Sequence, residues 1–138
     1  MTVTYYNKDV FSGDTMDVGV CNLYLNLAEK PIAATDLTVQ LATIPAGTVI
    51  QKIAMHVISG EGSSVATSIG DNAGASTWMA TGANLQTTDT TALMGAAETN
   101  VLGKFYTAAD KLLLTLGGAA STAKIMVMVS YMREPKYL

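Results

Sequence analysis

Residues 37–58 read LTVQLATIPAGTVIQKIAMHVI, and this stretch decides the fold class. Over residues 37–43, apolar side chains alternate with polar or small ones, which is the period-two pattern of a half-buried β-strand. Residues 45–47 are Pro-Ala-Gly and predict a turn, because proline fixes φ and glycine accepts a positive φ. The alternation resumes over residues 48–58, so the stretch predicts a strand, a turn and a second strand.

The strand predicted over residues 48–58 has two unlike faces. One face is apolar apart from a single glutamine, and the opposite face carries Lys52 and His56. Because alternate side chains of a strand point to opposite sides of a sheet, we expect the first face to lie in the core. The residues on that face are Val49, Gln51, Ile53, Met55 and Val57.

Period-two patterns and turn residues recur along the rest of the chain. The strand predicted over residues 124–133 is apolar on both faces, since three methionines lie opposite its Ile and Val residues. Residues 84–100 alternate little and predict a long loop, within which residues 91–97 permit a short helix. Asp71 follows a glycine and is interpreted as a turn residue that bonds to its own backbone. The other predicted strands span residues 17–27, 65–69, 78–79 and 111–116.

These patterns predict an all-β fold, a jelly roll or β-sandwich of about seven to eight antiparallel strands with extended terminal arms. An immunoglobulin-like sandwich is the alternative, although the Cys-Trp-Cys spacing of antibody domains is absent from the sequence. The length of 138 residues indicates one domain. We expect residues 17–132 to form it, with an N-terminal arm over residues 1–16 and a C-terminal tail over residues 133–138.

The composition argues against several classes of function. Only 14% of the residues are charged, against about 25% in typical domains, which indicates that a partner covers part of the surface. The net charge is −3 and the basic residues are scattered, so direct nucleic-acid binding is not expected. No apolar run is long enough for a signal peptide or a membrane span. We therefore expect a soluble protein, made in the cytosol, with no membrane partner.

The reactive side chains do not form a recognisable catalytic or metal site. The single Cys21 and the single His56 cannot make a disulfide or a structural zinc site. A nucleophilic pair of His56 with Cys21 or a serine has no supporting signature, so Cys21 is interpreted as a small core residue and His56 as part of a polar sheet face or a subunit contact. Calcium binding by Asp9, Asp14 and Asp17 is a further alternative, although their spacing differs from an EF-hand. The sequence predicts no enzyme activity and no cofactor.

The aromatic residues indicate two kinds of contact. Trp78 could stack on a sugar ring, with Tyr106 as another platform, but a lone tryptophan in a small β domain is more often a core residue. The terminal arms are too apolar to lie in water alone, so we expect them to dock on a neighbouring subunit, with folding back onto their own domain as the alternative. The predicted contact residues are Tyr5, Tyr6, Phe11, Met126, Met128, Met132, Tyr137 and Leu138.

Four segments of the chain are similar to one family of structural proteins. They read IPAGTVI at residues 44–50, SIGD at 68–71, GKFYTAAD at 103–110 and LLLTL at 112–116. Together they resemble the jelly-roll cement or decoration proteins of tailed bacteriophages, over roughly residues 37–132. The similar elements are turns and strands without chemical motifs, so no functional residue is carried over.

The resemblance implies a non-enzymatic virion protein that binds the outside of a phage head, bridges capsomers and stabilises the shell. Its implied partner is the major capsid protein, and it implies a homo-oligomer, a dimer or a trimer. The implied location is the outer capsid surface, after synthesis in the host cytoplasm. The alternatives are a head-fibre, neck or tail component, and a carbohydrate-binding jelly-roll module.

Overall fold

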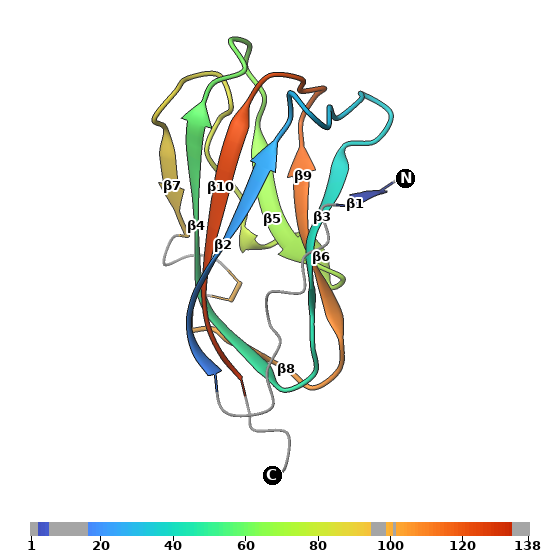
Figure 1. Ribbon diagram of the computed structural model, residues 1–138. Helices are drawn as coiled ribbons and strands as arrows, with labels where there is room; N and C mark the ends of the chain where they lie inside the picture. Colours follow the sequence, from blue (N-terminus) through green and yellow to red (C-terminus); the bar gives the residue numbers. More distant parts are fainter. Residues whose placement is uncertain (1–2, 6–16, 95–98, 101, 134–138) are drawn as a thin grey trace.

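The computed structural model describes residues 3–5, 17–94, 99–100 and 102–133, which fold as two β-sheets packed face to face (Figure 1). One sheet has the strand order β1-β3-β9-β5-β6, and the other has the order β2-β10-β4-β7, with β8 also pairing β4. The predicted all-β fold class is therefore confirmed. Within the described residues, no helix is long and apolar enough to cross a membrane. The strands are β1 (Val3–Tyr5), β2 (Asp17–Asn26), β3 (Thr38–Ile44), β4 (Thr48–Ser59), β5 (Thr67–Asp71), β6 (Gly74–Met79), β7 (Thr91–Leu93), β8 (Lys104–Tyr106), β9 (Asp110–Leu116) and β10 (Lys124–Arg133).

The strands pair in a nested order. β2 pairs with β10, β3 with β9, β4 with β7 and β8, and β5 with β6, all antiparallel. Successive nested pairs lie alternately in the two sheets. This is the path of a long hairpin rolled onto itself, which is a jelly roll and differs from the strand order of an immunoglobulin-like sandwich.

Three short strands were not predicted from the sequence. β1 pairs with β3 in parallel, although all pairings were expected to be antiparallel. The helix permitted over residues 91–97 is wrong for residues 91–93, because these residues form β7 and pair with Ala54–His56 of β4. Residues 95–97 lie outside the described part of the chain. β7 and β8 both pair with the twelve-residue β4, whose length gives two three-residue segments a partner that their own sequences do not indicate.

The core lies between the two sheets and is filled by alternate side chains. In β10, Ile125, Val127 and Val129 point inward and are fully buried, and each such side chain stabilises the fold by about 1.5–3 kcal/mol. Trp78 on β6 is also fully buried, which confirms its interpretation as a core residue. β10 lies between β2 and β4, so its inner face contacts the centre of the core.

A bulge in β4 changes which of its side chains face the core. The pairing of β4 with β10 shifts register between Ser130 and Tyr131, so that Ser130 lies opposite Lys52 and Tyr131 opposite Ile50. The extra residue is Gln51, which is exposed like Lys52. Beyond the bulge the alternation is inverted. Ile50 is therefore buried and Val49 only partly so, which corrects the single uninterrupted face predicted for residues 48–58.

The close approach of β6 to β5 requires glycine at position 70, within β5. A Cβ at Gly70 would overlap the backbone carbonyl group of Gly74, where the β5–β6 pairing is irregular. We predict that Gly70→Ala lowers the free energy of unfolding by about 2–3 kcal/mol, measured by urea denaturation, because backbone atoms have to move. The control is Gly118→Ala, where a Cβ meets no atom within 4 Å. Equal stability of the two variants would contradict this account of the β5–β6 pairing.

Candidate functional site

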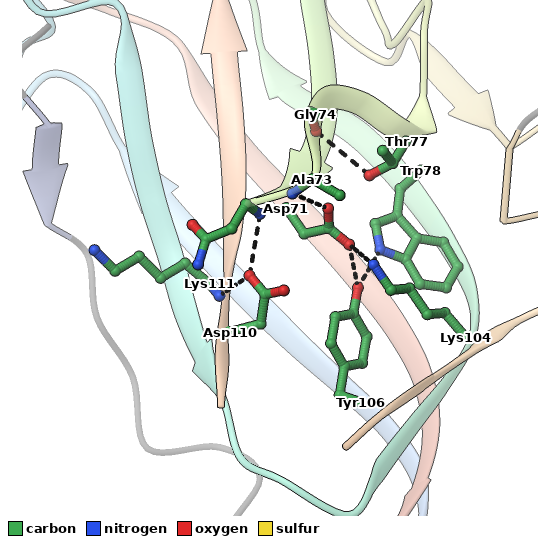
Figure 2. Close-up of polar contacts among 10 residues, drawn as sticks. Asp71, Ala73, Gly74, Thr77, Trp78, Lys104, Tyr106, Asp110 and Lys111 are labelled. Carbon is green, nitrogen blue, oxygen red and sulfur yellow. Dashed lines mark hydrogen bonds and ion pairs between the residues drawn. The ribbon is translucent and has the colours of Figure 1, made fainter. Parts of the chain in front are cut away.

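A buried polar network joins the two sheets (Figure 2). The Nε1–H of Trp78 donates to the hydroxyl oxygen of Tyr106 at 2.9 Å, and the Tyr106 hydroxyl donates to Oδ2 of Asp71 at 2.7 Å. The ammonium group of Lys104 donates to the same oxygen at 2.7 Å, and the backbone N–H of Ala73 donates to Oδ1 at 2.9 Å. Asp71 and Trp78 belong to β5 and β6, whereas Lys104 and Tyr106 belong to β8 in the other sheet.

These donors keep the Asp71 carboxylate ionised although its side chain is fully buried. Burial alone raises the pKa of Asp71, but the hydrogen bonds from Lys104, Tyr106 and Ala73 outweigh it and hold the pKa below the ordinary value. Burial and the neighbouring Asp71 carboxylate both raise the pKa of Tyr106, so its hydroxyl stays protonated. Both carboxylate oxygens of Asp71 already have donors, so the network acts as a structural tie between the sheets.

The network also tests whether Trp78 and Tyr106 could stack on a sugar, as a carbohydrate-binding module would require. Trp78 and Tyr106 are both buried, and each uses its polar atom within the network. A sugar ring stacks on an exposed aromatic face, which neither residue offers. The two proposed stacking platforms are therefore wrong. The interpretation of Asp71 as a turn residue is correct for Oδ1, which accepts from Ala73, but it missed the role of Oδ2.

A second carboxylate fastens a loop at one end of the molecule. The carboxylate of Glu61 accepts backbone N–H groups from Ser121, Thr122 and Ala123 at 2.8, 2.9 and 2.8 Å. Partial burial raises the pKa of Glu61, but these hydrogen bonds outweigh it and the net shift is downward. Glu61 thus fixes the segment just before β10 against the segment just after β4.

His56 and Cys21 lie on opposite faces of their sheet. Cys21 on β2 is partly buried and packs against the core. On the outer face His56 Nδ1 lies 2.6 Å from Thr91 Oγ1, and its Nε2 lies 3.6 Å from a carboxylate oxygen of Asp89. The structure therefore does not bring His56 and Cys21 together as a nucleophile and base, and it confirms His56 on a sheet face.

The outer face of the β2-β10-β4-β7 sheet carries apolar side chains among polar ones. Met126 lies between Tyr24 and His56 across the strands, and Met128 lies between Asn22 and Ala54. Below the bulge, Met132 lies opposite Val49, which pairs in turn with Phe105. We call this surface the methionine face. Its most exposed apolar side chains are Leu93 (73% exposed), Val20 (63%), Tyr24 (49%) and Phe105 (44%).

The predicted contact residues have three different placements. Met126, Met128 and Met132 lie partly buried along β10 on the methionine face, with Ser130 and the β4 bulge between Met128 and Met132. The backbone of Tyr5 belongs to β1 and pairs with Gln40. The other predicted contact residues, Tyr6, Phe11, Tyr137 and Leu138, lie outside the described part of the chain, as do Asp9 and Asp14 of the calcium alternative.

Sequence reasoning missed the exposed apolar neighbours of the methionines. The alternation over residues 17–27 places Tyr24 on the face away from the core, so the exposure of this residue could have been predicted. Leu93 and Phe105 gave no such signal, because each lies in a strand of three residues. Among the described residues, no group of three His, Cys, Asp or Glu side chains could hold a metal ion.

Comparison with known proteins finds similarity in structure only. The sequence matches no protein-family model and no curated protein. A chain in the capsid structure of Ralstonia phage GP4 has a TM-score of 0.65 at 13% identity, covering 94% of this chain and 98% of that chain. Chains from the capsids of cyanophage Pam1 (TM-score 0.59, 16% identity, 90% and 89% covered) and Helicobacter pylori bacteriophage KHP30 (0.58, 12%, 88% and 93%) are also similar. At these identities the comparison establishes a shared fold.

The buried network predicts acid sensitivity. The depressed pKa of Asp71 means that its contribution to stability is complete above the ordinary value of 3.8 and is lost as the pH falls through the lower, folded-state value. Tyr106→Phe removes one donor to Asp71 and the acceptor of Trp78. It should lower the free energy of unfolding by about 1–3 kcal/mol at neutral pH and move acid unfolding to higher pH.

This prediction is checked by urea denaturation at a series of pH values. The control is Tyr24→Phe, which removes a hydroxyl from an exposed ring and should leave both quantities unchanged. If the Tyr106 and Tyr24 variants behaved alike, the hydroxyl of Tyr106 would not be stabilising the network.

Proposed function

We propose that this chain is a non-enzymatic structural protein of a bacteriophage virion, and specifically a cement or decoration protein. In this role it binds the outer surface of the head, contacts the major capsid protein and bridges neighbouring capsomers. It assembles as a dimer or trimer, so that each copy adds to many linked contacts, and modest affinity per contact suffices.

The observation that carries the proposal is the extent of the structural similarity. The match to a chain of the Ralstonia phage GP4 capsid spans 94% of this chain and 98% of that one, so the two chains have nearly the same length. The other two similar chains also come from phage capsids and are matched over most of their length. In each of these capsid structures, a chain of similar length therefore shares this fold.

Features of the chain itself support a structural role. The buried Asp71 carboxylate is fully hydrogen-bonded, and His56 lies on a different face of its sheet from Cys21. The sparse charge and the methionine face fit a protein whose surface is partly covered in an assembly.

Copy number distinguishes the decoration role from its alternative. A decoration site repeats with the symmetry of the shell, so purified protein added to heads that lack it should co-sediment at on the order of hundreds of copies per particle. A head-fibre, neck or tail component would bind in a few copies only. Quantitative gel densitometry of the sedimented heads, with light scattering of the free protein for its oligomeric state, makes the measurement. Absence of binding would refute the decoration role.

The contact role of the terminal arms is tested by substitution. Deleting residues 1–11 would also remove β1, which pairs with β3, so the loss of an arm contact and the loss of a strand could not be separated. The double variant Phe11→Ser and Tyr137→Ser removes two apolar side chains and should weaken retention on heads by about tenfold, since aromatic anchors dominate many interfaces. Its urea midpoint should match that of the unmodified chain. Full retention would refute the arm contact.

A further inference from the structure

Two lysines flank the part of the methionine face that Met126 and Met128 form. Lys124 begins β10, on the same side of the sheet as Met126 and Met128. Lys52 lies across the strands from Ser130, which follows Met128 on that side. Ser130 is six positions after Lys124 in β10, so the backbone positions of the two lysines lie on the order of 20 Å apart along the strand.

These two lysines form no direct ion pair within the part of the chain that the structure describes. Neither makes an ion pair or a side-chain hydrogen bond with a described residue, whereas Lys104 is bound to Asp71. Asp89 lies beside this face and faces His56, and the Glu61 carboxylate accepts the backbone N–H of Ala123, which precedes Lys124. The chain as a whole has a net charge of −3, so the positive charge of these two lysines is opposite in sign to the overall charge.

We propose that the methionine face docks on a different protein whose surface has an apolar centre and carboxylates near both ends. The inference rests on the proposed function and names the chemistry of the partner surface. Methionine side chains are flexible and polarisable, so they adapt to an irregular apolar surface. Lys52 and Lys124 then steer the approach and fix the register, because charges at the rim of an interface act mainly on association rate and specificity.

Charge complementarity favours a foreign surface over a second copy of this chain. Two methionine faces packed on each other would bring four lysines into one interface with two Asp89 carboxylates, each already beside a histidine. Like charges brought together oppose association. An acidic-rimmed partner gains two attractive contacts instead.

The test reverses each lysine and measures binding to heads that lack this chain. Lys52→Glu and Lys124→Glu should each weaken binding about fivefold, and the double variant should weaken it further. Binding of the unmodified chain should also weaken as salt rises from about 0.05 to about 0.5 M. The matched control is Lys111→Glu, an equal change of charge at an exposed position of β9 in the other sheet, which should bind normally.

A second pair of variants tests the apolar centre. Met128→Glu places a charge in the middle of the face and should abolish binding, whereas Ser76→Glu, at an exposed position of β6, should not. Urea denaturation confirms that each variant is folded.

The outcomes separate this inference from the proposed function. If the unmodified chain binds heads and the lysine variants bind equally well, the acidic partner surface is refuted while the decoration role stands. If Met128→Glu instead dissociates a dimer of the free protein, the occupant is a second copy and the inference is overturned. If the unmodified chain does not bind heads, both fail.

Discussion

A strand in a two-layer sandwich can bury only one of its faces within its own molecule, and β10 is apolar on both. The period of two along a strand assigns Ile125, Val127 and Val129 to the core. It therefore assigns Met126 and Met128 to the opposite face, whatever their hydrophobicity. Because β10 lies between β2 and β4, this face is the centre of a sheet rather than an edge. Burying the isoleucine and valine side chains of β10 in the core thus places its methionine side chains on the outer surface.

The nested strand order makes a polar tie between the sheets possible. β5 and β6 are the innermost pair of the rolled hairpin, and β8 belongs to the next pair outward, in the opposite sheet. β5 and β8 come together where the Asp71 carboxylate accepts hydrogen bonds from Lys104 and Tyr106. A buried carboxylate is costly unless its oxygens are all hydrogen-bonded, so this pairing is demanding in geometry. It fixes how the two sheets are placed relative to each other at that end.

Local patterns in the sequence predicted the long strands, the fold class and the burial of Trp78, because each depends on alternation or on the size of one side chain. They did not predict the bulge at Gln51, since a bulge depends on the register with β10, which is a property of two strands. β7 and β8 were missed for a related reason: three residues carry no period, and they become strands by pairing with β4. The network around Asp71 joins residues more than thirty positions apart, which no spacing rule describes.

This chain shares its fold with phage capsid chains although only 12–16% of the residues are identical. What is specific to this protein therefore lies in its side chains. A jelly roll needs alternating apolar residues in its strands, turn residues between them and a packed interior. These requirements leave the outer side chains free to vary. Function then depends on the surface that the fold presents and not on the fold itself. In this chain the surface combines three methionines with exposed Val20, Tyr24 and Leu93, and it has lysines in a chain of net negative charge. None of these side chains belongs to the buried core, and we therefore propose that they serve a contact outside the molecule.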